Sequence, residues 1–332
     1  MSRSPKKRIL FIGTRTWELT SVHLQYFVDE EANIVGFIES PTDSITSTTS
    51  GGSKSVPINE VADSLDLPIL QTSDLKSKMV HEWVKTLSPD IIVVVGYQFF
   101  LPKEFLDLAP MGAVNFHTSL LPRHCGKHPA FWTIWYGDKY SGMTIHQMDD
   151  GLDTGRILYY NCVEVKNGDT VDSLYKRIWD KDKDLVSDFL CDLDSSESIV
   201  CARKRLNLYG CGWDRLNGLD EQDYSYNYTP NEKDYVLDFR YPAQTLANRC
   251  SMKPHSFYVE YDGARFYPTK YSVIDEPTTS RNFKLGTPYR YKGSVVFVTP
   301  DKWLKIDQVD LYGEPYVGDC WAGKEKEITI RQ

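Results

Sequence analysis

The segment NFHTSLLPRHCGKHP (115–129) carries the side chains of this sequence best suited to proton transfer. Asn115 and His117 follow an apolar run at a spacing of two, and residues two apart on a strand point to the same face. The amide and the imidazole would then project together where the strand ends, which is where open α/β sheets bind ligands. A histidine can act as acid or base, and an amide can donate a hydrogen bond to a developing oxyanion.

Two further segments could complete a site. MDDGLDTGRIL (148–158) is an acidic loop, punctuated by glycine, between two expected strands, and it could bring a carboxylate back to the sheet. A carboxylate beside a histidine fixes its tautomer and raises its pKa. VVVGYQFFLPKEF (93–105) is an apolar strand that ends in a loop of Gly, aromatic residues and Pro. A histidine, a carboxylate and an amide together suit acyl transfer.

Simpler interpretations of these patterns stay open. An Asn-x-His pair can be a hydrogen-bonded pair at a strand end, and DDGLDTG can be a turn or a weak cation-binding loop. Three histidines, His117, His124 and His128, could bind zinc, but they do not form a pair of i,i+4 ligands on one expected helix and no C-x-x-C pair accompanies them, so we expect no metal. GTRTWE (13–18) takes a ligand-loop position after the first strand but lacks a dinucleotide fingerprint.

Apolar runs alternate with helical patterns in the first half of the chain. Strands are expected at 8–13, 33–40, 89–96, 112–117, 141–148 and 155–165, and helices at 17–29, 57–65, 73–87, 128–137 and 169–190. Residues 40–56 are rich in Ser, Thr and Gly and indicate a loop. The alternation predicts a Rossmann-like α/β domain with a parallel sheet over residues 1–200.

The second half changes character. After about residue 210 the sequence becomes rich in Tyr, and short strands are separated by turns such as YDG (261–263) and TPDK (299–302). One helix is expected at 241–250. Residues 210–332 are therefore predicted to form a smaller β-rich C-terminal domain.

Composition limits the cellular setting. The chain has 332 residues, 41% of them hydrophobic, and a net charge of −8, which disfavours a general nucleic-acid binder. Seven cysteines without a C-x-x-C pair predict free thiols in a reducing cytoplasm. We expect neither a signal peptide nor a membrane span, because no apolar run approaches 18 residues.

The combination of NFHTSLLPRHCG with SGMTIHQMDDGLDTGRIL strongly resembles the 10-formyltetrahydrofolate-dependent formyltransferase family. The usual core of that family reads Asn-x-His-x-Ser-Leu-Leu-Pro, followed some thirty residues later by Gly-Leu-Asp-x-Gly. The resemblance is clear over residues 1–195 and loose beyond 228. It implies an N-formyltransferase with 10-formyltetrahydrofolate as co-substrate.

Carried over residue by residue, the resemblance implies a catalytic triad of Asn115, His117 and Asp153. An acceptor amine would attack the formyl carbon, Asn115 would stabilise the oxyanion, and His117, oriented by Asp153, would accept the proton. The resemblance also implies that the folate lies between two segments, whose residues are Phe99, Phe100, Leu101, Asp149, Asp150 and Gly151.

Differences between this chain and two branches of the family indicate the class of acceptor. Glycinamide ribonucleotide formyltransferases are shorter and carry a Gly-Ser-rich phosphate loop that this chain lacks. Methionyl-tRNA formyltransferases usually have a basic loop after the second strand, but here 40–56 holds one Lys and no Arg. Residues 211–332 contain 16 Lys and Arg against 18 Asp and Glu. Phosphate backbones need clustered cations, so a tRNA acceptor is the alternative and not the main prediction.

A nucleotide-linked amino sugar, such as dTDP-4-amino-4,6-dideoxyglucose, is the predicted acceptor, with a product that enters surface glycans. Arg15 and Lys127 are candidates for contacting its diphosphate, and Trp17, His128 and Trp132 for shaping the sugar site. Each could equally be a surface charge or a core aromatic. A hydrolase of formyltetrahydrofolate is a third interpretation. The C-terminal domain could pair subunits into a homodimer.

Overall fold

The computed structural model describes most of the chain in two compact units. The described residues are 5–14, 17–41, 65–195, 225–261, 264–275, 283–311 and 314–317. The first unit takes residues up to 130 together with 140–164 and 174–228. The second takes 131–139, 165–173 and the residues from 229 onward.

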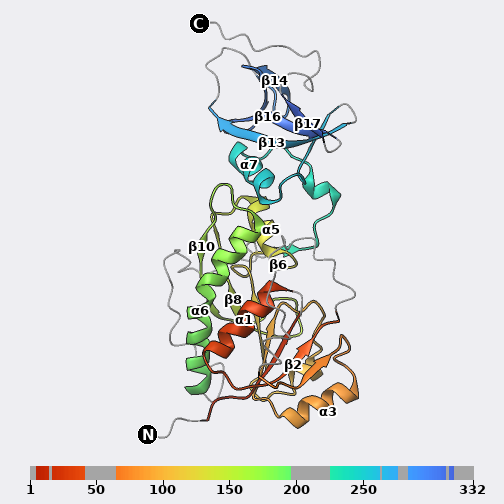
Figure 1. The fold of residues 1–332 in the computed structure, drawn as a ribbon, viewed down its shortest axis with the longest axis vertical. Coiled ribbons are helices and arrows are strands. Elements are labelled where there is room, and N and C mark those ends of the chain that lie inside the picture. Colours follow the sequence, from red (N-terminus) through yellow and green to blue (C-terminus); the bar gives the residue numbers. More distant parts are fainter. Residues whose placement is uncertain are drawn as a thin grey trace. The chain divides into compact units, whose positions relative to one another are not determined.

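The first unit contains a seven-stranded sheet of order β3-β2-β1-β4-β5-β8-β9 (Figure 1). Its strands are β1 (Ile9–Gly13), β2 (Ile34–Glu39), β3 (Ile69–Gln71), β4 (Ile91–Val95), β5 (Ala113–His117), β8 (Thr144–Gln147) and β9 (Ile157–Tyr160). The first five strands pair in parallel, and β8 and β9 close one edge antiparallel. This sheet confirms the predicted Rossmann-like architecture, although β3 was not expected.

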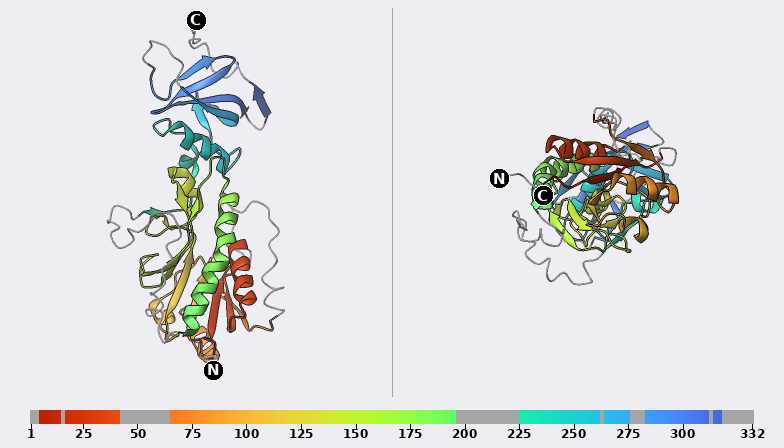
Figure 2. Two further views of the ribbon diagram at one scale, coloured as in Figure 1. Left: turned by 90° about the vertical axis from the view of Figure 1, so that its left-hand side faces the viewer. Right: turned by 90° about the horizontal axis from the view of Figure 1, so that it is seen from below.

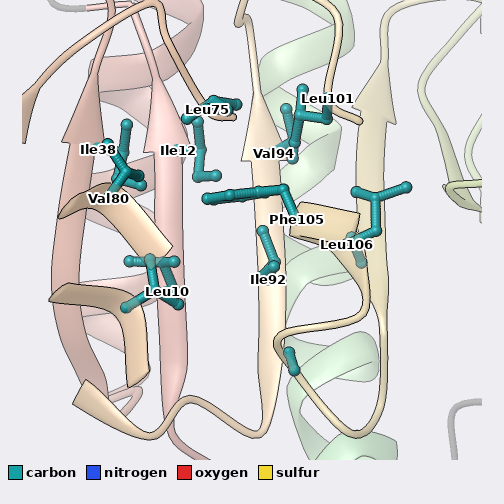
Figure 3. Close-up of a cluster of buried hydrophobic side chains, with 13 residues drawn as sticks. Leu10, Ile12, Ile38, Leu75, Val80, Ile92, Val94, Leu101, Phe105 and Leu106 are labelled. Carbon is teal, nitrogen blue, oxygen red and sulfur yellow. The ribbon is translucent and has the colours of Figure 1, made fainter. Parts of the chain in front are cut away.

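Apolar, largely β-branched strands place this sheet in the middle of the unit. Every residue of β1 and of β4 is buried, as expected for central strands covered on both faces. Leu10 and Ile12 point to one face, where they join a cluster with α3 (Lys78–Leu87) and α4 (Lys103–Leu106) (Figure 3). Phe11, between them, points to the other face.

Two helices cover that other face. They are α1 (Glu18–Asp29) and α6 (Val171–Ser195), and Figure 2 shows them side by side in red and green. Phe27 of α1 and Phe189 of α6 both lie against Phe116 of β5, with ring centroids 5.8 Å from it. The strand that carries the Asn115–His117 pair is thus anchored through the residue between them.

Short elements complete this unit. β6 (Cys125–Gly126) pairs in parallel with β11 (Tyr226–Asn227), and β7 (Tyr140–Ser141) pairs antiparallel with β10 (Val163–Glu164). The β6–β11 pair joins segments about 100 positions apart, which no local pattern in the sequence predicts.

The helix predicted at 73–87 begins later, at Lys78. The side chains of Thr72 and Asp74 accept hydrogen bonds from the amides of Asp74 and Lys76, so the chain turns before the helix. Such local bonds compete with helix formation. The expected helix at 57–65 and the loop at 40–56 lie almost entirely outside the described residues.

The second unit is built on an antiparallel sheet. Its order is β12-β13-β16-β15-β14, with β17 paired to β16. The strands are β12 (Val259–Tyr261), β13 (Ala264–Ile274), β14 (Pro288–Tyr291), β15 (Ser294–Val298), β16 (Trp303–Leu311) and β17 (Glu314–Val317). The hairpin predicted at 299–302 is confirmed, since β15 pairs with β16 across it.

Helical segments accompany this sheet. They are α5 (Pro129–Tyr136), which begins in the first unit, the 3₁₀ turn η4 (Glu232–Tyr235) and α7 (Ala243–Met252). Asp301 in the β15–β16 turn accepts a hydrogen bond from the amide of Ala243, at the start of α7. The hairpin therefore supplies the helix with the N-terminal acceptor that Pro242 cannot provide.

The cysteines differ in part from the prediction. Cys125, Cys191 and Cys250 are thiols that form no disulfide, as expected. Cys162 is disulfide-bonded, so the prediction of free thiols is wrong for that residue. The other cysteines lie outside the described residues. Of the helices that the structure describes, none is long and apolar enough to cross a membrane.

Candidate active site

Asn115 and His117 lie at the carboxyl end of β5, side by side as their spacing predicts. His117 is 7% exposed and Asn115 is half-buried, while Phe116 between them points into the opposite face of the sheet. The pair therefore sits on a rigid central strand and not on a loop, which is the better platform for precise geometry.

Asp153 joins them from the loop that follows β8. Its Oδ2 lies 3.6 Å from Nδ1 of His117, and its Oδ1 lies 3.4 Å from Nδ2 of Asn115. The amide of Gly126 donates to Oδ2 at 2.7 Å. The structure thus brings together the three residues that the resemblance named, although Asn115 and Asp153 are 38 positions apart in the sequence.

A backbone carbonyl fixes the tautomer of His117. Nε2 lies 2.8 Å from the carbonyl oxygen of His124, and a carbonyl can only accept, so Nε2 carries the hydrogen. In the neutral ring Nδ1 then has the lone pair, and it faces Asp153. The His124 carbonyl holds the ring at Nε2, and Asp153, which the resemblance names as the orienting group, lies beside Nδ1, where the ring would take up a second proton.

The charges of the pair are set by burial and by their neighbours. Burial lowers the pKa of His117, against the attraction of Asp153 and the carbonyl of His124. The imidazole is therefore neutral at neutral pH and free to accept a proton. Burial alone would raise the pKa of Asp153, but the imidazolium forms of His117 and His146, together with the Gly126 amide, outweigh burial and hold that pKa below its usual range. Asp153 stays a carboxylate.

The segment that holds His117 and Asp153 is itself held by β11. The amide of Cys125 donates to the carbonyl of Ser225 at 2.8 Å, and that of Lys127 to the carbonyl of Asn227 at 3.1 Å. Nδ2 of Asn227 donates to Nδ1 of His124 at 3.0 Å. These contacts fix the positions of the two backbone groups that touch the triad, which are the carbonyl of His124 and the amide of Gly126.

Gly126 must be glycine for this contact to form. Its φ is +89°, and a Cβ there would stand 2.5 Å from the carbonyl oxygen of Asn227. Sequence reasoning missed both Asn227 and the carbonyl of His124, because backbone groups and long-range pairing leave no residue pattern to find.

Replacing Asn227 tests whether β11 tunes the site. In Asn227→Ala the ring of His124 loses its buried donor, which costs about 1–3 kcal/mol of stability. The loosened carbonyl of His124 is expected to lower kcat roughly tenfold, since small misplacements near reacting groups are costly. The measurements are thermal unfolding and steady-state formyl transfer. Unchanged kcat in a variant with lowered stability would contradict a role in positioning.

The two segments predicted to bind folate also converge. Leu101 belongs to the buried cluster on the α3 face of the sheet (Figure 3). Met148 and Tyr97 pack against the same cluster. A hydrogen bond and the charge of Asp107 raise the pKa of Lys103, and the charge of Asp150 adds to that shift.

Apolar side chains remain open to solvent on these segments. Phe100 is 62% exposed and Leu152 is 46% exposed, while Phe99 is half-buried against the ring of Tyr97. Oδ1 of Asp149 accepts from the amide of Gly151 and the hydroxyl of Thr154, which fixes the turn.

The residues predicted to bind the acceptor lie in different surroundings. Trp17 precedes α1 and lies beside Gly96, at the carboxyl end of β4. Lys127 is exposed and His128 half-buried, both just after Gly126. Trp132 lies in the second unit, 2% exposed among the rings of α5, so it packs as a core residue. Arg15 lies outside the described residues.

The zinc alternative gains no support. Nε2 of His117 faces the carbonyl of His124, and Nδ1 of His124 faces Asn227. Across the described part of the chain, no three His, Cys, Asp or Glu side chains are grouped as a metal site would need.

A family model described as formyl transferase matches residues 7–190, more than half of the chain. The chain belongs to the formyl transferase family. Its predicted membership is thereby confirmed, and the formyl donor of that family is 10-formyltetrahydrofolate.

A curated relative is the methionyl-tRNA formyltransferase of a Nitratiruptor species. It is 36% identical over 193 residues, which make up 58% of this chain and 62% of the relative. The match thus spans less than two thirds of that relative's length.

Two solved structures share the fold over most of this chain. The sugar 3N-formyl transferase WlaRD, studied with dTDP and 5-N-formyl-THF, has a TM-score of 0.57 at 15% identity and covers 91% of this chain and 98% of its own. The N-formyltransferase from Helicobacter canadensis, in complex with folinic acid and dTDP-3-aminofucose, has a TM-score of 0.58 at 14% identity, with 90% and 98% covered.

The residues present fit a reduced folate. An exposed phenyl ring at Phe100 and an exposed Leu152 offer apolar contact to a flat ring system.

Proposed function

We propose that this protein transfers the formyl group of 10-formyltetrahydrofolate to the amine of a nucleotide-linked amino sugar. The observation that supports it best is the buried cluster of Asn115, His117 and Asp153 at the carboxyl end of β5. Residues 1–200 would carry the chemistry.

The proposed chemistry follows from the tautomers and charges of the cluster. 10-Formyltetrahydrofolate supplies a formyl carbon open to attack by an amine. Nδ2 of Asn115 donates a hydrogen bond to the formyl oxygen as negative charge develops there. Nδ1 of His117 takes the proton that the attacking amine loses, directly or through a water. Asp153, ionised 3.6 Å away, stabilises the imidazolium and keeps its own charge.

The same proton completes the exchange. As the new C–N bond of the formamide forms and the bond to N10 of the folate breaks, N10 requires a proton, and the imidazolium of His117 can return the one it took. Atoms and charges then balance without an acyl-enzyme, because the acceptor amine is itself the nucleophile. His117 ends neutral, ready for the next turnover.

A small anionic acceptor suits the charges available to the site. Lys127, next to the Gly126 amide that holds Asp153, is an exposed cation beside the triad, and Arg15 follows the end of β1 in sequence. We propose that these two contact the diphosphate and that Trp17 and His128 shape the sugar site. The likeness in fold over about nine tenths of the chain to a sugar 3N-formyl transferase, and to an N-formyltransferase in complex with dTDP-3-aminofucose, supports this acceptor class.

A methionyl-tRNA acceptor is the second candidate, because the relative that is 36% identical has that activity. The charge of the C-terminal part of this chain argues against a tRNA acceptor. Residues 211–332 hold 16 Lys and Arg against 18 Asp and Glu, whereas binding to a phosphate backbone gains from clustered cations.

The test is a direct comparison of acceptors. We expect the purified protein to convert 10-formyltetrahydrofolate to tetrahydrofolate only when a dTDP- or UDP-linked 3- or 4-amino sugar is present, beginning with dTDP-4-amino-4,6-dideoxyglucose. Mass spectrometry of the sugar nucleotide should show one added formyl group. Turnover with aminoacylated initiator tRNA in place of any amino sugar would reject the acceptor proposed here. Formate release without an amine would show a hydrolase.

A further inference from the structure

His146 lies against the triad on the neighbouring strand. It belongs to β8, where it pairs directly opposite Asn115 of β5, and it is 2% exposed. The pairing of β8 with β9 shifts register between Ile145 and His146, an irregularity of the kind that re-aims side chains near active sites. The sequence interpretation used His146 only as part of an alternating strand.

The surroundings of His146 fix its tautomer. Nδ1 lies 3.1 Å from the carbonyl oxygen of Gln147, so Nδ1 carries a hydrogen. In the neutral ring Nε2 is then bare, and it lies 3.1 Å from Nδ2 of Asn115, which can only donate. The imidazole therefore accepts a hydrogen bond from the amide of Asn115.

This contact occupies one side of that amide. Nε2 of His146 and Oδ1 of Asp153 are 3.1 Å and 3.4 Å from Nδ2 of Asn115, and 3.5 Å from each other. Seen from Nδ2, the two acceptors are therefore separated by about half the angle between the two N–H bonds of an amide, so one N–H can lie between them and face both. The second N–H points elsewhere and stays available.

We propose that His146 is a positioning residue that holds the amide of Asn115 with its second N–H directed at the formyl oxygen. The proposal rests on the function proposed above. The opposite rotamer of the amide would turn the Asn115 oxygen toward the Asp153 carboxylate and the lone pair of His146, where three acceptors would meet without a hydrogen. Asp153 and His146 together therefore exclude it, and the oxyanion donor is set before substrate arrives.

The first test reads the tautomer without any turnover. In protein labelled with ¹⁵N at histidine, His146 should show a protonated Nδ1 and a bare Nε2 at neutral pH, assigned by comparison with His146→Gln. In protein labelled at asparagine, the Asn115 side-chain amide should shift on addition of 5-formyltetrahydrofolate. A protonated Nε2 on His146 would overturn the proposal, whatever acceptor the enzyme uses.

The second test distinguishes the hydrogen-bond acceptor of His146, its Nε2, from the packing of its side chain. Gln places its amide oxygen at the reach of the imidazole Nε2, and Met places a methyl group there. His146→Gln should stay within about threefold of the native kcat, and His146→Met should fall roughly ten- to hundredfold, with the KM for the folate little changed in both. The loss is smaller than for a deleted donor, because Asn115 remains.

The outcomes are distinct. Equal kcat in His146→Gln and His146→Met, whether high or low, would reject the role. A Met variant with a lowered unfolding temperature is judged by the ¹⁵N shift of Asn115, which should no longer respond to 5-formyltetrahydrofolate as in native protein. If native protein turns over no amino sugar, the acceptor proposal fails, while the tautomer and the Asn115 shift still decide the role of His146.

Discussion

His117→Ala and Asp153→Asn are each expected to lower kcat by about 10²–10⁴, the usual contribution of a positioned general base. His117→Ala removes the atom that accepts the proton. Asp153→Asn keeps the shape and can still accept from Gly126, but it removes the charge 3.6 Å from the protonated ring. The measurement is single-turnover formyl transfer with saturating 10-formyltetrahydrofolate.

A second His–Asp pair in this chain provides the control. Nδ1 of His255 lies 2.7 Å from Oδ2 of Asp310 in the second unit, where the histidine is 64% exposed. His255→Ala and Asp310→Asn make the same chemical changes and should leave kcat within about twofold, since the pair belongs to the second unit and not to the triad. Single-turnover rates that survive in both triad variants would show that the chemistry takes place elsewhere.

The pH profile should reflect the burial of His117. Because burial lowers its pKa, the ring stays neutral and active below the pH at which an exposed histidine becomes protonated. The acid limb of kcat/KM is therefore expected below about pH 6.5, the ordinary pKa of histidine, and activity is lost only as the pH falls through the lowered pKa. In Asp153→Asn the attraction that favours the imidazolium is gone, so the limb should move to still lower pH. An acid limb above that of free histidine would contradict this account.

The sequence alone predicts a site residue best where local backbone geometry determines the direction of its side chain. Asn115 and His117 could be placed together because strand residues two apart share a face, and the apolar run before them marks a central strand. Asp153 could be named only through the resemblance, since DDGLDTG by itself fits a turn equally well. The structure supplies the missing link, in which the Gly126 amide holds the carboxylate at His117.

What the sequence could not provide is register and long-range pairing. His146 meets Asn115 only because β8 pairs antiparallel with β5 in one particular register, and a shift of one residue would turn its ring to the other face. Asn227 meets His124 through a two-residue strand pair across 103 positions. Neither contact has a periodicity to detect. His146 and Asn227 act on Asn115 and on His124, which lie in or against the triad. Such supporting residues can therefore be identified only after the triad has been located.

Asp182→Leu is expected to destabilise the first unit by about 3–5 kcal/mol, because it removes one partner from a buried polar network. Asp182 on α6 is fully buried, and its Oδ2 lies 3.0 Å from Nε2 of His23 on α1. Asn161 donates to its other oxygen. The ring of His23 packs on Phe116, the residue between Asn115 and His117, so the network supports the catalytic strand from behind.

Denaturant unfolding measures this loss, with Asp184→Leu on the exposed side of the same helix as the control. That control should cost less than about 0.5 kcal/mol. The variant Asp182→Leu with His23→Leu removes the orphaned imidazole and should recover part of the stability, as replacing both partners of a buried pair often does. Formyl transfer should fall with the folded fraction and not below it, since Asp182 touches no reacting atom. A loss of kcat in fully folded Asp182→Leu would mean that the α1–α6 contact also sets the position of β5.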